Sequence, residues 1–141
     1  MDVKAWIVCV IEPNKFERQI IFDLLRQAGV ERVRVMEHAD EALEVLEAYR
    51  ANVIISSFEI EGSDAAAWTR VFRRSKDVAN RKAAVFVTSA AFSRTMAEQC
   101  RHAGANALIG KPLSTKVLLA TINKVLTQPR EFIDAEGYVG P

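Results

Sequence analysis

Five short apolar runs, rich in β-branched residues and bounded by polar ones, recur along the chain. The clearest is Val53-Ile54-Ile55-Ser56-Ser57-Phe58, which ends abruptly in hydroxyl residues. A run of this length without polar alternation is typical of a strand buried on both faces, as in an open parallel sheet. The other four predicted strands span residues 5–11, 33–36, 83–89 and 107–109.

Apolar residues at helical spacing, about one every 3.6 residues, fill the segments between these strands and after the last one. Asn14 and Ser114 are predicted N-caps, with Glu17 at capping-box spacing from Asn14, and Gly29 and Gly104 end two of the helices. Residues 58–64 are expected to form a loop. The predicted apolar positions are Phe16, Ile20, Ile21, Leu24, Leu25 and Ala28; Ala39, Ala42, Leu43, Leu46 and Tyr49; Trp68, Val71 and Phe72; Met96, Cys100 and Ala103; and Val117, Leu118, Ile122, Val125 and Leu126.

Strict alternation of strands and helices requires right-handed crossovers and a parallel sheet with helices on both faces. The predicted fold class is therefore α/β, a doubly wound five-stranded parallel sheet, formed by residues 1–127. The pattern stops at Gln128, so residues 128–141 are predicted to be a tail and not a separate domain. Phe132, Ile133, Tyr138 and Val139 make the tail too apolar for a linker, so it folds back on the domain or docks on another protein.

Composition and charge narrow the classes of function. The chain has 141 residues, 19 basic and 18 acidic, for a formal net charge of +1. This balance does not draw the protein toward DNA or a membrane surface. No apolar run approaches the roughly 20 residues that span a bilayer, and no signal peptide is recognised, so a cytoplasmic protein is expected. Cys9 and Cys100 are predicted to be buried, reduced thiols, and Trp6 and Trp68 to be packing residues.

Polar residues follow the predicted strands at the edge where ligands of parallel sheets bind. Glu12, Ser57 and Thr88 lie at or just after three strand ends, and Lys111 lies in the loop after the last strand, so we expect them to share one crevice. An acid, two hydroxyls and a lysine could suggest nucleophilic catalysis. However, no general base accompanies Ser57, so an enzyme is the least favoured reading.

The order of these residues resembles the receiver domains of two-component response regulators, over about residues 3–126. The resemblance rests on Val10-Ile11-Glu12-Pro13 followed by Arg18, on Ser57 after an apolar strand, on Val87-Thr88-Ser89, and on Gly104-Ala105 leading to Lys111-Pro112. It implies a flavodoxin-like fold of the CheY type with strand order 2-1-3-4-5. It also implies protein partners, with docking or a homodimer through the fourth helix, fifth strand and fifth helix.

In that family an aspartate at the Ser57 position accepts a phosphoryl group from a histidine kinase. Two acids after the first strand hold magnesium, a Thr or Ser contacts the phosphoryl oxygen, and the lysine neutralises it. The acid pair here is Glu12-Pro13, and Leu108 replaces the aromatic residue that reports phosphorylation. We therefore predict a pseudo-receiver that is not an enzyme, without catalytic residues, metal or cofactor, and that acts as a stand-alone interaction module.

Without a phosphoryl group, Lys111 needs another anionic partner, because an unpaired charge in a partly buried crevice is costly. We predict that Lys111 pairs with Glu12 or donates a hydrogen bond to Ser57 and nearby carbonyl groups. The alternative is that the flexible side chain extends into solvent.

A second hypothesis concerns a basic cluster between residues 70 and 82, which could bind an acidic partner or a phosphate-rich ligand such as a cyclic dinucleotide. The tail also resembles tails of single-domain receivers of alphaproteobacteria, and some such proteins bind cyclic di-GMP through arginine-rich tails. A solvated helix end is the alternative reading of the cluster. Its members are Arg70, Arg73, Arg74 and Arg81, with Lys76 and Lys82.

Overall fold

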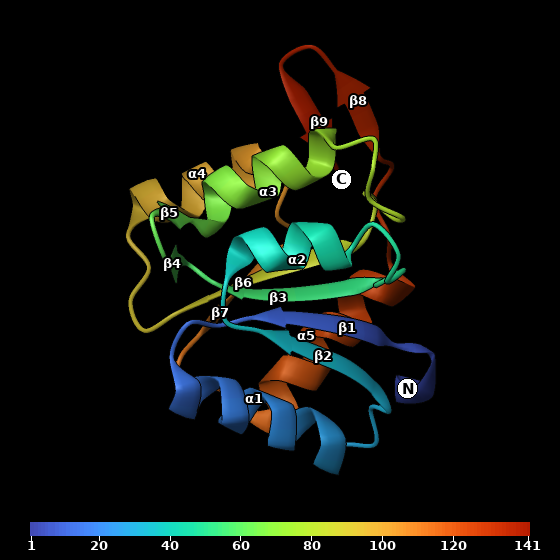
Figure 1. Cartoon of the computed structure of the whole chain (residues 1–141), viewed down its shortest axis with the longest axis vertical. Coiled ribbons are helices and arrows are strands. Elements are labelled where there is room, and N and C mark those ends of the chain that lie inside the picture. Colours follow the sequence, from blue (N-terminus) through green and yellow to red (C-terminus); the bar gives the residue numbers. More distant parts are fainter.

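Five parallel strands form the central sheet in the computed structural model, which describes all 141 residues (Figure 1). Their order is β2 (Arg32–Met36), β1 (Ile7–Ile11), β3 (Val53–Ser57), β6 (Ala84–Ser89) and β7 (Ala107–Gly110). The predicted fold class and strand order are confirmed. The first strand begins later than expected, because residues Val3–Ala5 form a 3-10 turn, η1.

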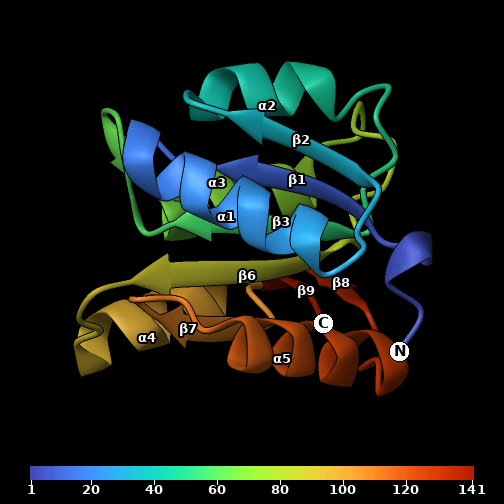
Figure 2. The same ribbon diagram turned by 90° about the horizontal axis from the view of Figure 1, so that it is seen from below.

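Helices cover both faces of the sheet (Figure 2). One face carries α1 (Lys15–Gln27) and α5 (Thr115–Thr127), and the other carries α2 (Ala39–Val45), α3 (Ala65–Arg74) and α4 (Arg94–Ala103). Successive strand residues point to opposite faces. Val8 and Val10 of β1 pack toward α1 and α5, whereas Cys9 and Ile11 pack toward the other three helices. Both sets are fully buried, which explains the unbroken apolar run.

The aromatic and sulfur side chains of the core have the predicted structural roles. Trp68 stacks on Phe72 with ring centroids 5.2 Å apart, and its indole Nε1 donates to the carbonyl oxygen of Ala39 at 3.1 Å. Both cysteines are free and buried. Burial raises the pKa of the Cys9 thiol to about 12 and that of Cys100 to about 11. Neither thiol is therefore ionised at neutral pH.

Four predicted core positions in the helices are wrong. Phe16 in α1 is 81% exposed, and Ile20 in α1, Val71 in α3 and Val117 in α5 are also exposed. Each lies at the margin of a stripe whose centre is buried, for example Ile21, Leu24 and Leu25 in α1. A helical stripe read from sequence has no sharp edge, because the neighbouring helix decides how far burial extends.

The helix caps lie at the predicted residues. The side chain of Asn14 accepts a hydrogen bond from the backbone N–H of Glu17 at 3.0 Å, and that of Ser114 accepts from Val117 at 3.4 Å. Gly29 and Gly104 have φ of 97° and 104°, the left-handed conformation favoured by glycine after a helix. The reciprocal capping-box bond from Glu17 is absent, since the N–H of Asn14 donates instead to Glu12 Oε2 at 3.1 Å.

Replacing Asn14 with alanine should lower the free energy of unfolding by about 1 kcal/mol, because the first turn of α1 loses its side-chain acceptor. Urea denaturation followed by tryptophan fluorescence measures the change. Asn14→Ser keeps an acceptor at this position and should retain most of the stability. Equal losses in both variants would contradict a capping role for Asn14.

Two segments expected to lack regular structure contain short hairpins. Within residues 58–64, β4 (Glu59–Ile60) pairs with β5 (Ser63–Asp64). In the tail, β8 (Ile133–Ala135) pairs in antiparallel fashion with β9 (Tyr138–Gly140). Of the two expectations for the tail, folding back on the domain is the one observed.

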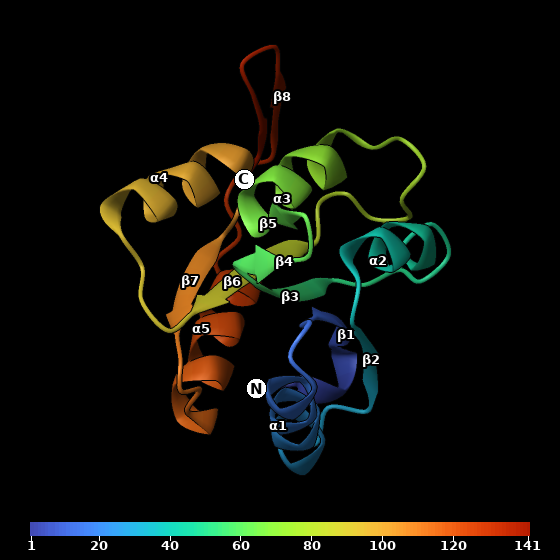
Figure 3. The same cartoon turned by 60° about the vertical axis from the view of Figure 1, so that its left-hand side comes forward.

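The tail hairpin packs where α3 and α4 end (Figure 3). Val139 is 4% exposed. The backbones of the tail and of Gly104 approach so closely that a Cβ on Gly104 would lie 2.8 Å from the carbonyl oxygen of Val139. Position 104 therefore needs glycine for two reasons, the helix end and the docked tail.

Candidate functional site

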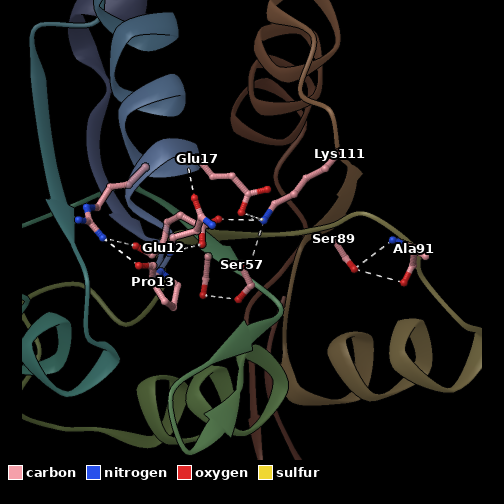
Figure 4. Close-up of polar contacts among 10 residues, drawn as sticks. Glu12, Pro13, Glu17, Ser57, Ser89, Ala91 and Lys111 are labelled. Carbon is pink, nitrogen blue, oxygen red and sulfur yellow. Dashed lines mark hydrogen bonds and ion pairs between the residues drawn. The ribbon is translucent and has the colours of Figure 1, made fainter.

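A crevice of about 500 Å³ opens at the carboxyl ends of the strands, where the sequence predicted it (Figure 4). The parallel register aligns the ends of the central strands, with Ile11 beside Ser56 and Ser57 beside Thr88. The residues that line the crevice are Glu12, Pro13, Asn14, Glu17, Ser57, Glu59, Ser89, Ala90, Ala91, Met96 and Lys111.

Lys111 is the centre of the polar contacts in this crevice. Its Nζ lies 2.9 Å from Glu12 Oε1 and 3.2 Å from Ser57 Oγ. A third contact, of 3.2 Å, reaches Glu17 Oε2 (Figure 4). The three oxygens match the three donors of an ammonium group. The predicted pairing with Glu12 and Ser57 is confirmed, and the solvent-extended alternative is wrong, since the side chain is only 13% exposed.

Glu12 is a buried carboxylate, and each of its two oxygens has a partner. Its side chain is 2% exposed, with Oε1 on Lys111 and Oε2 accepting from the N–H of Asn14. Its backbone carbonyl accepts from Arg18 Nη1 at 2.8 Å, which fixes the turn between β1 and α1. A buried carboxylate is tolerated because both oxygens are satisfied in this way.

Glu17 is a site residue that the sequence analysis missed. The capping-box motif accounted for its presence, yet its side chain turns toward Lys111. The available signal was its place in the first turn of a helix that begins at the crevice, five positions after Glu12. Lys111 therefore pairs with two carboxylates where the sequence indicated one, and a third carboxylate, that of the exposed Glu59, also lines the crevice.

The hydroxyl residues occupy two different environments. Ser57 is 8% exposed and lines the crevice. Thr88 pairs with Ser57 in the sheet but is fully buried, does not line the crevice, and its Oγ1 has no hydrogen-bond partner. Ser89 lines the crevice instead, and its Oγ closes a turn with the backbone N–H and carbonyl of Ala91. Thr88 thus lies beside Ser57 but is covered, and it is not among the residues that line the crevice.

Two further features limit the chemistry of the crevice. No cluster of three or more Asp, Glu, His or Cys side chains suited to a metal is formed anywhere in the chain. The hydroxyl of Ser57 contacts an ammonium group, which is a donor and not a base.

Leu108 in β7 pairs with Val87 and packs, partly buried, against the core beneath α2, α3 and α4.

The predicted arginine cluster is not assembled on the surface. Arg73 is fully buried and donates to backbone carbonyls, including Gly104 at 2.8 Å and Ala83 at 2.6 Å. Arg81 Nη2 is 2.6 Å from the carboxylate of Asp134 in the tail, and this pairing lowers the pKa of Asp134. Only Arg70 and Arg74 of the four arginines remain exposed without a partner. Arg73 lies in the interior because its guanidinium donates hydrogen bonds to acceptors on three surrounding segments.

Comparison with known families agrees with the fold. Residues 8–123 match the response regulator receiver domain family. The chain belongs to this family. The receiver domain has no helix of sufficient length and apolarity to cross a membrane.

Several curated proteins are similar to this receiver domain. The transcriptional regulatory protein PdtaR of Mycobacterium tuberculosis is 29% identical over 136 residues, which cover 94% of this chain and 62% of PdtaR. The receiver domain thus spans 62% of the length of this relative. The polar-differentiation response regulator DivK of Brucella anthropi is 25% identical over 122 residues, covering 84% of this chain and 94% of DivK.

Solved structures share the fold. Chemotaxis response regulator CheY4 of Vibrio cholerae has a TM-score of 0.76 at 21% identity, covering 85% of this chain and 98% of CheY4. The receiver domain of sensor histidine kinase PA1611 from Pseudomonas aeruginosa has a TM-score of 0.77 at 21% identity, covering 87% and 98%. The PA1611 structure has a magnesium ion coordinated in its active-site cleft.

Proposed function

We propose that this receiver domain does not accept a phosphoryl group and that it acts in signalling as a binding module for protein partners. One observation carries the proposal. The residue at the end of β3 is Ser57, and its hydroxyl is bonded to Lys111, whose ammonium is also bonded to Glu12 and Glu17. The groups that would receive a metal and a phosphate are thus bonded to each other.

The chemistry of phosphoryl transfer supports this reading. A carboxylate is a charged nucleophile that needs no base, whereas a serine hydroxyl must lose its proton to one. Magnesium requires a nearly octahedral shell of oxygen ligands. Here Pro13 contributes no carboxylate, and Glu12 and Glu17 already pair with an ammonium ion. The exposed Glu59 is then the one acid lining the crevice that has no ion pair. Neither the nucleophile nor the metal site is complete.

Protein contact is the remaining activity that the fold supports, and we expect it through α4, β7 and α5. Leu108 lacks the polar tip of a tyrosine, so a phosphorylation-driven rotation at this position is not expected to control that surface. The cyclic-dinucleotide reading of the predicted arginine cluster is not favoured, because Arg73 lies in the interior and Arg81 pairs with Asp134.

Intact mass spectrometry after incubation with acetyl phosphate and magnesium tests the proposal. The unmodified chain should keep its mass. A Pro13→Asp/Ser57→Asp variant restores a second acid and a charged acceptor beside Lys111, and it should gain the mass of one phosphoryl group. Phosphoryl incorporation into the unmodified chain would contradict the proposal. The variant serves as the positive control for the assay.

Beryllofluoride with magnesium provides an independent test that needs no covalent step. The backbone amide resonances around Ser57 should remain unchanged in the unmodified chain when the reagents are added at micromolar concentration. Saturable shifts at Ser57 and Lys111 would show that the crevice still binds a metal and a phosphate analogue, and would count against the proposal.

A further inference from the structure

Two adjoining cavities lie at the end of the sheet opposite the crevice, between the amino ends of β6 and β7, helix α5 and the tail. Their volumes are about 410 and 380 Å³. Asn106, which immediately precedes β7, and Arg130, from the tail, line both of them. Cavities of this size are suited to small molecules.

The walls of these cavities carry several basic side chains and no acidic side chain. Arg101 of α4, Lys124 of α5 and Arg130 line the first, and Lys82 joins Arg130 in the second. No residue that lines either cavity has an acidic side chain. None of the four cations forms a salt bridge within the chain. The last residue, Pro141, also lines both cavities and brings one terminal carboxylate. Four convergent cations exceed this single negative charge, and a bound anion would reduce the repulsion that remains among them.

Asn106 adds a donor whose orientation is fixed from behind. Its Oδ1 accepts from the backbone N–H of Val85 at 2.8 Å and from Arg73 Nη2 at 3.0 Å. These two bonds assign the oxygen, so the Nδ2 amino group is the other end of the amide. It has no hydrogen-bond partner in the protein. Two hydrogen-bond donors thus hold Asn106 in place, and its free amino group is part of a residue that lines both cavities.

We propose that this second site binds a small anion that carries phosphate groups. Guanidinium groups such as those of Arg101 and Arg130 can grip phosphate oxygens in bidentate fashion, and Lys124 adds a point charge. The site shares no residue with the crevice of Glu12, Ser57 and Lys111. It is therefore independent of the proposed absence of phosphorylation, and either proposal can fail alone.

Backbone amide NMR with sodium pyrophosphate, and separately with adenosine diphosphate, tests the site in the full chain at constant ionic strength. Both probes should produce saturable shifts centred on Asn106, Lys124 and Arg130. Arg101→Gln/Lys124→Gln should weaken binding by about tenfold or more, because two charge-assisted contacts are lost. Both side chains are exposed, so the variant should fold as the parent does.

The matched control is Lys15→Gln/Lys116→Gln, which removes the same charge from exposed positions on α1 and α5 outside both cavities. It should leave the affinity unchanged. Equal affinity for the two probes would assign recognition to the phosphates alone, and tighter binding of the nucleotide would add a contact to its base or sugar. Absence of saturable shifts with both probes, or equal weakening in the two double variants, would overturn the proposal.

Discussion

Replacing Arg73 with methionine is expected to lower the free energy of unfolding by about 3 kcal/mol or more. The guanidinium is fully buried and donates to the carbonyl oxygens of Gly104, Arg81 and Ala83 at 2.6–3.1 Å. It also donates to Asn106 Oδ1. Methionine fills similar space but leaves these acceptors buried without a donor. Urea denaturation, monitored by tryptophan fluorescence, measures the loss.

Arg73 is a buried cation without a carboxylate partner. Several groups with partial negative charge stabilise it instead. Gly104 follows α4, where the helix dipole presents partial negative charge. The rings of Phe72 and Phe132 each lie 5.7 Å from the guanidinium carbon. Burial lowers the pKa of Arg73 to about 10, which still leaves it charged at neutral pH. One side chain thus joins α3, the start of β6, the end of α4 and the tail.

Arg74 provides the matched control, because it is the next residue of the same helix and its side chain is exposed. Arg74→Met should change stability by no more than about 0.5 kcal/mol. Arg73→Lys retains the charge but lacks the planar fork of donors, so most of the loss should persist. Similar stabilities for Arg73→Met and Arg74→Met would contradict the role assigned to Arg73.

The sheet could be predicted from the sequence because its strands are buried on both faces. No alternation with polar residues obscures β1, β3 or β6, and local turn residues mark their ends. The helix caps were predictable for the same reason, since Asn14, Ser114 and Gly104 act within a few residues of themselves. These features depend on residues that are close together in the chain, so a short stretch of sequence is enough to predict them.

The role of Arg73 could not be predicted in this way. Arg70, Arg73 and Arg74 occupy the same basic helix, and nothing in the local sequence separates them. The difference arises from acceptors that lie eight to 33 positions further along the chain, from Arg81 to Asn106. The position of the tail could not be predicted for the same reason. Val139 is buried against α3 and α4, which are distant from it in the sequence.

The crevice was predicted in part. Glu12, Ser57 and Lys111 come together because the ends of parallel strands share one edge, a rule that follows from topology alone. Glu17 was missed because a short-range motif explained it equally well, and the competing partner, Lys111, is 94 positions away. Thr88 lies beside Ser57 in the sheet but is covered, and Ser89, the next residue of β6, lines the crevice.

Replacing Lys111 with methionine should lower the free energy of unfolding by about 2–3 kcal/mol. Removing one partner of a buried ion pair leaves an uncompensated charge, here the carboxylate of Glu12, which is 2% exposed. The value lies below the usual range for buried pairs because Glu17 is 41% exposed and can turn to water. Urea denaturation at neutral pH provides the measurement.

A double-mutant cycle with Glu12→Gln separates the ion pair from the packing of the lysine stem. If the ammonium stabilises the fold by neutralising Glu12, the double variant should lose clearly less stability than the sum of the two single variants. Lys116→Met, at an exposed position of α5, controls for the loss of one positive charge and should be nearly neutral. Additive losses, or no loss in Lys111→Met, would mean that Lys111 does not neutralise Glu12 in place of the metal ion that the crevice is proposed to have lost.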